Sequence, residues 1–225
     1  MSNTPRVPVC RDSWSSLDTL VTAVRRCRIC RDAPQYGRPL DHEPRPIVQV
    51  SATARICIAG QAPGIRAHAR GLPFADPSGV RLRQWMGIDE EAFYDAARIA
   101  ILPMGFCFPG LNARGSDLPP RRECALAWRA ALFTWLPRLE LLLLVGRHAQ
   151  QWHLRHLSLP SRLIRQSVHE TVRGWREIYE ADERMSHLVL PHPSWRNSGW
   201  LKRNPWFEAE VIPVLREKVH TLLSS

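Results

Sequence analysis

Short apolar runs along the chain predict the strands of a buried sheet. They cover residues 55–59, 97–103, 140–145 and 187–191. Runs this short and this apolar are typical of strands whose two faces are both covered by helices. The stretches between and after them predict helices over residues 78–86, 89–97, 120–135, 147–157 and 204–223. Because strands and helices alternate, we predict an α/β fold, a three-layer α/β/α sandwich around a mostly parallel central sheet.

The chain is long enough for one enzyme-sized domain. Its 225 residues are 44% hydrophobic, and no stretch reaches the roughly 18 consecutive apolar residues that a membrane span needs. We expect a monomer away from membranes, with residues 1–14 as a mobile N-terminal tail and residues 15–225 as a single domain. Residues 34–49, rich in proline and charge, predict a long loop over the surface.

Two of the predicted strands end in polar turns that can meet. Gly60-Gln61-Ala62-Pro63-Gly64 follows the first strand, and His192-Pro193-Ser194 follows the last. Ligands of open α/β sheets bind at the carboxyl ends of the strands, so the two turns are placed to share one pocket. The pattern predicts a site with a small-residue turn on one side and a histidine on the other.

The excess of basic residues indicates which class of partner the protein can attract. The chain carries 31 Lys and Arg against 21 Asp and Glu, a formal net charge of +10, and its pI is about 10.2. A basic surface attracts phosphate groups in a salt-dependent manner without reading sequence. Many basic proteins bind no nucleic acid, so the charge favours DNA only together with the motifs.

Six cysteines raise the question of a metal. The first residues lack the apolar core of an export signal, so we expect a reducing cytoplasm, in which structural disulfides are disfavoured. Cys27 and Cys30 form a C-x-x-C pair, and Cys107 and Cys124 flank a sixteen-residue loop. Four thiolates suit a 4Fe-4S cluster, they also fit a tetrahedral zinc site, and a third alternative is that the cysteines bind no metal. We expect Cys57, inside a strand, to be a buried apolar residue.

The motifs, taken in order, resemble a known family. The turn Gly60-Gln61-Ala62-Pro63-Gly64, then Gly71-Leu72-Pro73-Phe74, then His192-Pro193-Ser194 after a late strand are similar to the uracil-DNA glycosylase superfamily, nearest to its iron-sulfur branches. The resemblance runs from about residue 26 to residue 219. It implies a monofunctional glycosylase of base excision repair that flips out uracil, hydrolyses its N-glycosidic bond and leaves an abasic site in single- or double-stranded DNA. It also implies a cytoplasmic, nucleoid-associated protein.

The same resemblance assigns the cysteines. Iron-sulfur glycosylases carry an early C-x-x-C pair and a later pair around a proline-containing loop. The expected ligands of a structural 4Fe-4S cluster are therefore Cys27, Cys30, Cys107 and Cys124, with zinc as the less expected alternative.

Roles in the pocket follow from the resemblance as well. Phe74 is expected to stack on the flipped base, His192 to donate a hydrogen bond to the ring carbonyl, and Ser194 to hold a backbone phosphate. The main chain of the first turn is expected to approach the base closely, at Gly60, Ala62, Pro63 and Gly64. Relatives insert a wedge into the base stack from the region after the histidine motif, which here holds Trp195, Arg196 and Asn197. Burial of Trp195 against Trp200 or Trp206 is the alternative.

The group that activates water is left open by the motifs. Gln61 stands where many iron-sulfur relatives carry an acid, and its amide cannot act as a base, although it can orient water or contact the flipped base. Asp76 resembles an acid that follows the stacking aromatic in another iron-sulfur branch, and it fits equally well as the N-terminal cap of the next helix. His68 is a further candidate for the pocket wall.

Two departures from the family pattern loosen the expected pocket. Pro103 stands where many relatives use an asparagine to read the uracil edge, and Gly64 stands where the best-known uracil enzymes carry a tyrosine that blocks the thymine methyl. We therefore expect activity on at least one damaged base besides uracil. The same departures leave two alternatives open, a nonenzymatic iron-sulfur module that binds DNA and a cluster protein that acts in electron transfer.

Overall fold

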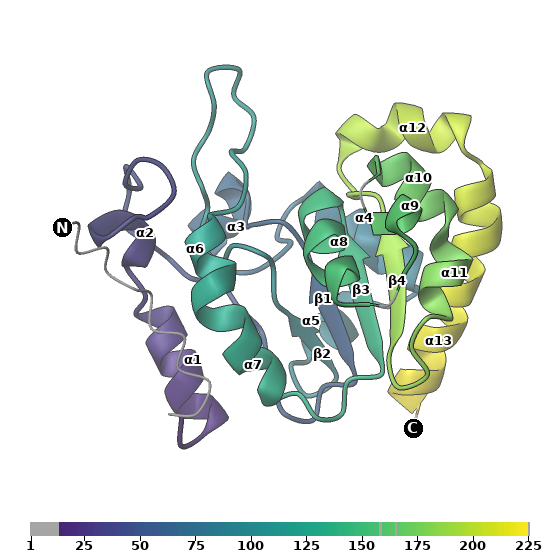
Figure 1. The fold of residues 1–225 in the computed structure, drawn as a ribbon, viewed down its shortest axis with the longest axis horizontal. Helices are drawn as coiled ribbons and strands as arrows, with labels where there is room; N and C mark the ends of the chain where they lie inside the picture. Colours follow the sequence, from purple (N-terminus) through teal and green to yellow (C-terminus); the bar gives the residue numbers. More distant parts are fainter. Residues whose placement is uncertain (1–13, 158, 165, 225) are drawn as a thin grey trace.

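A parallel sheet forms the centre of the protein (Figure 1). The computed structural model describes residues 14–157, 159–164 and 166–224. In these residues the sheet has four strands in the order β2-β1-β3-β4, all parallel: β1 (Ile56–Ala59), β2 (Ile99–Ile101), β3 (Leu141–Val145) and β4 (Ser186–Leu190). All four predicted strands are confirmed: β1, β2 and β3 are shorter than the apolar runs that predicted them, and β4 has the predicted length but begins and ends one residue earlier.

Helices cover both faces of the sheet, which explains why every strand residue except Ser186 is buried. In Figure 1, α7 and α8 lie in front of the sheet and α4 lies behind it, where it packs against α13. The three-layer α/β/α prediction is confirmed. The bounds of the covering helices are α4 (Pro77–Met86), α5 (Glu90–Tyr94), α6 (Arg122–Cys124), α7 (Ala130–Thr134), α8 (Arg147–His153) and α13 (Ile212–Ser224).

The expected helices are present with altered ends. The helix expected over residues 120–135 is one run in which the π-helical segment η1 (Ala125–Arg129) joins α6 to α7. The helix expected over residues 147–157 is α8 followed by the 3-10 turn η2 (Leu154–His156), and the C-terminal helix begins as the π-helical segment η4 (Phe207–Val211). The π-helical and 3-10 segments change the helix pitch locally, and the helices still lie where the sequence predicted them.

Several short helices were not expected from the sequence. They are α1 (Leu17–Arg25), α2 (Ile29–Asp32), α3 (Ile65–Arg70), α9 (Ser161–Ile164), α10 (Val168–Arg173), α11 (Trp175–Tyr179), α12 (Ser198–Arg203) and the 3-10 turn η3 (Trp195–Asn197). Two of them begin at capping boxes, α1 at Ser16 with Thr19 and α10 at Ser167 with Glu170.

The segment over residues 34–49 runs over the surface and then enters the fold. Ile47 and Val48 are buried, and Gln49 forms an isolated antiparallel bridge with Ile101. This bridge covers the outer edge of β2, which would otherwise expose unpaired backbone groups. The expected tail, including Cys10, lies outside the described residues up to residue 13, whereas Trp14 packs against Trp128 with ring centroids 6.1 Å apart.

Two connections place the functional loops. The chain leaves β1 toward β2 on one side and leaves β3 toward β4 on the other, so the adjacent strands β1 and β3 form a topological switch point, where open α/β sheets bind ligands. The teal segment between β2 and α6 projects from the body at the end of the molecule where α12 lies (Figure 1). Among the described residues, no helix is long and apolar enough to cross a bilayer.

Candidate active site

An open cleft of about 710 Å³ lies among the loops that follow the strands. The two turns predicted to share a pocket both line it, together with residues of α4 and of the segment between β2 and α6. The predicted residues that the structure brings together here are Gly60, Gln61, Ala62, Pro63, Gly64, Phe74, Asp76, His192, Ser194, Trp195, Arg196 and Asn197. Pro103 lines the cleft as well.

Phe74 lies at close range to the first turn. A Cβ atom on Gly60 would lie only 3.1 Å from Cζ of the Phe74 ring, so any larger residue would push the ring away. The turn itself is fixed, because the carbonyls of Gly60 and Gln61 accept hydrogen bonds from the backbone N–H groups of Met104 (2.9 Å) and Gly105 (2.8 Å). A ring and a bare stretch of main chain thus form one wall, a surface on which a planar ring can stack.

The backbone of Phe74 is strained. Its φ of +54° lies in the left-handed region that residues other than glycine rarely occupy, and such strain concentrates at functional sites. Phe93 packs edge-to-face against the ring at a centroid distance of 6.1 Å. Gly79 of α4 approaches so closely that a Cβ atom there would overlap the Phe74 carbonyl oxygen. The start of α4 therefore holds Phe74 in a conformation that an isolated chain would avoid.

His192 presents a neutral imidazole to the cleft. Its Nδ1 atom accepts a hydrogen bond from the backbone N–H of Ser194 at 3.3 Å, which places the ring proton on Nε2. Burial lowers the pKa of His192 below its usual value, and the charge of Asp76 opposes this only in part. A neutral histidine with its proton on Nε2 is suited to donate to a carbonyl oxygen on which negative charge develops.

Two side chains that the sequence did not single out for this role hold the histidine loop in place. Nη1 of Arg81, in α4, donates to the carbonyl oxygens of Pro193 (3.3 Å) and Ser194 (3.0 Å), and its Nη2 donates to Oγ of Ser198 (3.1 Å). Nδ2 of Asn197 donates to the carbonyl oxygen of His192 at 2.7 Å. Asn197 was expected near the wedge, and its amide instead braces the catalytic candidate.

Gly146 brings the ends of three strands together. A Cβ atom on it would lie 3.2 Å from Nε2 of Gln61 and 3.6 Å from Cβ of His192, and its φ of +81° favours glycine. Gln61 after β1 and His192 after β4 therefore both lie close to Gly146, the residue that follows β3. The sequence analysis did not single out this glycine, because its role depends on which strands are neighbours.

The cleft holds two carboxylates. Oδ1 of Asp76 accepts from the backbone N–H groups of Ser78 (2.8 Å) and Gly79 (3.3 Å), so Asp76 caps α4 and also lines the cleft. Asp117, from the segment between β2 and α6, was not predicted as a site residue by the sequence analysis. Partial desolvation raises the pKa of Asp117, Arg196 lowers it, and Asp76 raises it again. His148 of α8 also lines the cleft, and burial lowers its pKa.

Two expectations are corrected. His68 does not line the cleft, because its ring turns to the other side of α3 and packs against His42 (centroids 4.9 Å apart) and Phe108 (5.9 Å). The alternative that Trp195 is buried against Trp200 or Trp206 is wrong, since Trp195 is 73% exposed. Its neighbour Arg196 lies over its ring at 5.8 Å.

We predict that Arg81→Ala slows turnover by about tenfold, the equivalent of about 1.4 kcal/mol in the barrier, because the loop that carries His192 loses three hydrogen bonds. Arg81→Lys restores part of the rate. The measurement is single-turnover base release beside the melting temperature, with the exposed Arg70→Ala as the matched loss of a cation. A rate equal to wild type in Arg81→Ala contradicts the positioning role.

Comparison with known families identifies the superfamily of the chain. Residues 47–216, most of the chain, match the family model for the uracil DNA glycosylase superfamily. The chain belongs to this superfamily. It has a DNA glycosylase role in general terms, and the family implies DNA binding. The chain is also similar to a solution NMR structure of a candidate uracil DNA glycosylase from Methanosarcina acetivorans, at 15% identity, a TM-score of 0.45, and coverage of 76% of this chain and 94% of that one.

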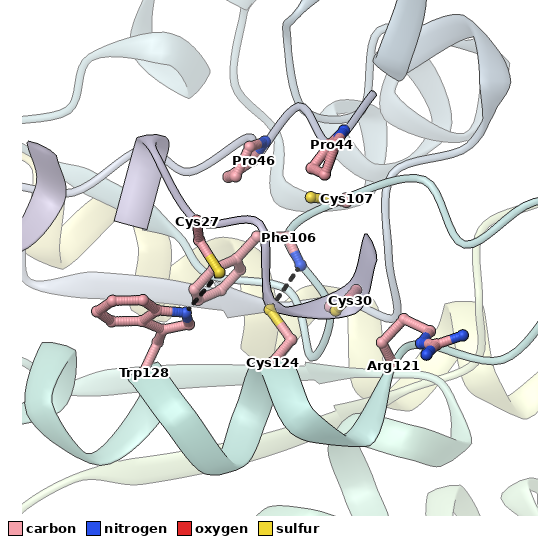
Figure 2. A pocket seen from close by; sticks show the side chains of 10 residues that line it. Cys27, Cys30, Pro44, Pro46, Phe106, Cys107, Arg121, Cys124 and Trp128 are labelled. Carbon is pink, nitrogen blue, oxygen red and sulfur yellow. Dashed lines mark hydrogen bonds between the residues drawn. The ribbon is translucent and has the colours of Figure 1, made fainter. Parts of the chain in front are cut away.

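This superfamily member carries a second constellation away from the cleft (Figure 2). Four cysteine side chains line one cavity: Cys27 before α2, Cys30 in α2, Cys107 after β2 and Cys124 in α6. Nε1 of Trp128 donates to Sγ of Cys27 (3.2 Å), and the backbone N–H of Phe106 donates to Sγ of Cys124 (3.3 Å). Cys57 lies in β1 and is fully buried, as predicted.

The electrostatics of this cavity favour neutral thiols in the protein alone. Burial raises the pKa values of Cys30 and Cys107 to about 12 and that of Cys124 well above its usual value. The cysteines also raise one another's pKa values. Holding all four as thiolates therefore requires positive charge among them, which iron or zinc would supply.

A buried cation lies next to this constellation. Arg129 in η1 is buried, and no carboxylate of the described residues pairs with it. Its Nη1 donates to the carbonyl oxygens of Leu102 and Pro103, while its Nη2 is a buried donor without a partner in the same residues. Burial lowers the pKa of Arg129 to about 10, opposed by Cys57 and Cys124. An anionic group at Cys124 would compensate this charge.

Proposed function

We propose that the protein is a monofunctional uracil-DNA glycosylase that hydrolyses the N-glycosidic bond of a flipped nucleotide. The observation that carries this proposal is the pairing of Phe74 with a neutral His192 in one cleft at the switch point of the sheet. An aromatic ring supplies stacking, and the histidine supplies a donor for the ring carbonyl.

The reaction follows from charge. When the bond between base and sugar breaks, its electron pair leaves with the base, so negative charge develops on the pyrimidine and positive charge on the sugar. The Nε2–H group of His192 is available to stabilise the first, because Nδ1 is occupied by Ser194. The main-chain groups of residues 60–64 and the amide of Gln61 are the remaining candidates to read the polar edge of the base.

Binding to DNA is proposed to use the mouth of the cleft. Ser194 lines it at a position suited to a backbone phosphate, and Arg196 is exposed there. Trp195 is the candidate wedge, because a large exposed ring beside the cleft can enter the space that a flipped base leaves. The formal net charge of +10 supports phosphate attraction.

We also propose a structural 4Fe-4S cluster on Cys27, Cys30, Cys107 and Cys124. The four side chains come from three separate segments and line one cavity, and zinc on the same four thiolates is the alternative. A cubane spreads its thiolates over four irons. The buried Arg129, whose Nη2 has no partner among the described residues, and the two N–H donors to sulfur suit an anionic centre. The cluster would connect α2 with the segment after β2.

We predict that the enzyme releases uracil preferentially and at least one other damaged base measurably. Gly64 and Pro103 leave the pocket open, and a site that relies on shape and stacking separates close analogues by only about 1 to 3 kcal/mol. The test is base release from a panel of single-lesion oligonucleotides, single-stranded, paired and mismatched. Release of uracil alone contradicts the open pocket, and DNA binding without any release supports the nonenzymatic module.

A further inference from the structure

A hydrogen-bonded hairpin carries Asp117 into the cleft. Residues Leu111 and Asp117 form an antiparallel bridge, and the backbone N–H of Leu118 donates to the carbonyl of Gly110 at 2.9 Å. Oδ1 of Asn112 accepts from the backbone N–H groups of Arg114 and Ser116 and so closes the tip. The hairpin lies between Cys107 and Cys124, and the position of Asp117 is therefore set by backbone pairing.

Asp117 and Asp76 face the same point of the cleft. A Cβ atom on Gly64 would lie 3.4 Å from Oδ2 of Asp117 and 3.9 Å from Oδ2 of Asp76. Oδ1 of Asp76 is used to cap α4, which leaves its Oδ2 free for the cleft. Gly64 has no side chain to separate the two carboxylates, so both can contact one small ligand lying over it.

The Asp117 carboxylate accepts no hydrogen bond from the described residues. Within the described residues, no hydrogen bond or salt bridge reaches its side chain, and it is exposed at the mouth of the cleft. The charged groups nearest to it are Asp76 and Arg196. Phe74 and Gly60 are in contact with one another, and Asp117 and Asp76 lie together at Gly64, four residues further along the same turn. A base stacked at Phe74 would therefore leave its sugar to face the two carboxylates.

We propose that Asp117 and Asp76 act together as the catalytic carboxylate pair, which faces the developing positive charge on the deoxyribose and receives a proton from the attacking water. This inference rests on the proposed glycosylase function. The water oxygen bonds to C1′ of the sugar as the bond from C1′ to the base nitrogen breaks. One water proton passes to a carboxylate of the pair, the other stays on the new hydroxyl, and the departing base takes up a proton from the pair or from solvent.

The pair supplies what Gln61 lacks. An amide neither accepts a proton at neutral pH nor carries the negative charge that stabilises a cationic sugar. A carboxylate with a raised pKa is the better base, and Asp76 together with desolvation moves Asp117 in that direction. Two carboxylates at one point also hold the charge of the transition state more strongly than one.

The test uses Asp117→Asn, Asp76→Asn and the double variant in the full-length protein. Asp41→Asn, at an exposed position, is the matched loss of one negative charge. Single-turnover release of uracil is measured beside binding to two duplexes, one with a neutral tetrahydrofuran abasic site and one with a cationic pyrrolidine in its place. Wild type should prefer the cationic sugar mimic.

We expect Asp117→Asn to slow release at least tenfold and to reduce the preference for the cationic mimic by a similar factor, with affinity for the neutral duplex within about twofold. The double variant should lose less than the product of the single effects, because the two groups act as a unit. Asp41→Asn should match wild type in both assays.

The binding comparison separates this inference from the glycosylase proposal. If wild type releases no base, the glycosylase proposal fails and the catalytic role of the pair fails with it, whereas a lost preference in Asp117→Asn still places the carboxylate beside the sugar. An unchanged preference in Asp117→Asn overturns the inference, whether or not the rate falls, because the carboxylate then does not face the sugar. A wild-type rate in Asp117→Asn overturns it as well.

Discussion

His192→Ala is expected to slow the release of uracil by at least about a hundredfold, the range that follows from removing one preorganised donor at a developing oxyanion. The donor is preorganised because Ser194 fixes the ring tautomer, while Arg81 and Asn197 hold the loop. The measurement is single-turnover base release, beside affinity for abasic-site DNA. Affinity should change little, because His192 acts on the base and not on the phosphates.

His220→Ala is the matched control, since this histidine is exposed on α13 and does not line the cleft. Its rate should equal that of wild type. Base release by His192→Ala at the wild-type rate removes His192 from the mechanism and returns the role to Gln61 or the main chain.

The lowered pKa of His192 also predicts the direction in which the free energy of unfolding changes with pH. Burial lowers the pKa of His192 in the folded protein below that of the unfolded chain, so the folded state binds fewer protons. This contribution to the free energy of unfolding is present above the usual histidine pKa of about 6.5 and is lost as the pH falls below it. Protonation of Nδ1 also removes the acceptor for the backbone N–H of Ser194, so the rate of base release should decrease as the pH falls as well.

The sequence predicted the parts of the fold that depend on local pattern. Leu141–Val145 is an unbroken apolar run, and it is buried throughout as β3. The two polar turns line one cleft because parallel strands bring their carboxyl ends to one edge. The roles assigned to His192, Phe74 and Ser194 remain predictions, as do the alternatives of a nonenzymatic module and an electron-transfer protein.

What the sequence did not predict depends on packing between distant segments. Arg81 is one of 31 basic residues, and only the approach of α4 to the histidine loop distinguishes it. Asp117 lies in a segment of polar and small residues, where no periodicity shows that a hairpin will bend it over Gly64. His68 follows the first turn closely in sequence, yet the helical turn of α3 directs its ring away from the cleft.

Cys124→Ser is expected to lose iron and to lower stability by at least about 3 kcal/mol, roughly 6 to 12 °C in melting temperature for a domain of this size. The wild-type protein should be brown, absorb broadly near roughly 400 nm, and contain iron and inorganic sulfide. The physical reason is that the cluster would join α2, the chain after β2 and α6, the three segments that supply the four cysteines of the cavity.

Cys57→Ala is the matched control, because Cys57 is also a buried thiol but lies in β1, outside the cysteine cavity. It should keep its iron and lose only the small cost of a removed buried atom. Arg129→Met extends the argument: if Arg129 compensates an anionic cluster, its loss should weaken iron retention, whereas a merely structural arginine would lower stability and leave the iron content of the folded fraction unchanged. Stoichiometric zinc without iron in the wild-type protein contradicts the cluster.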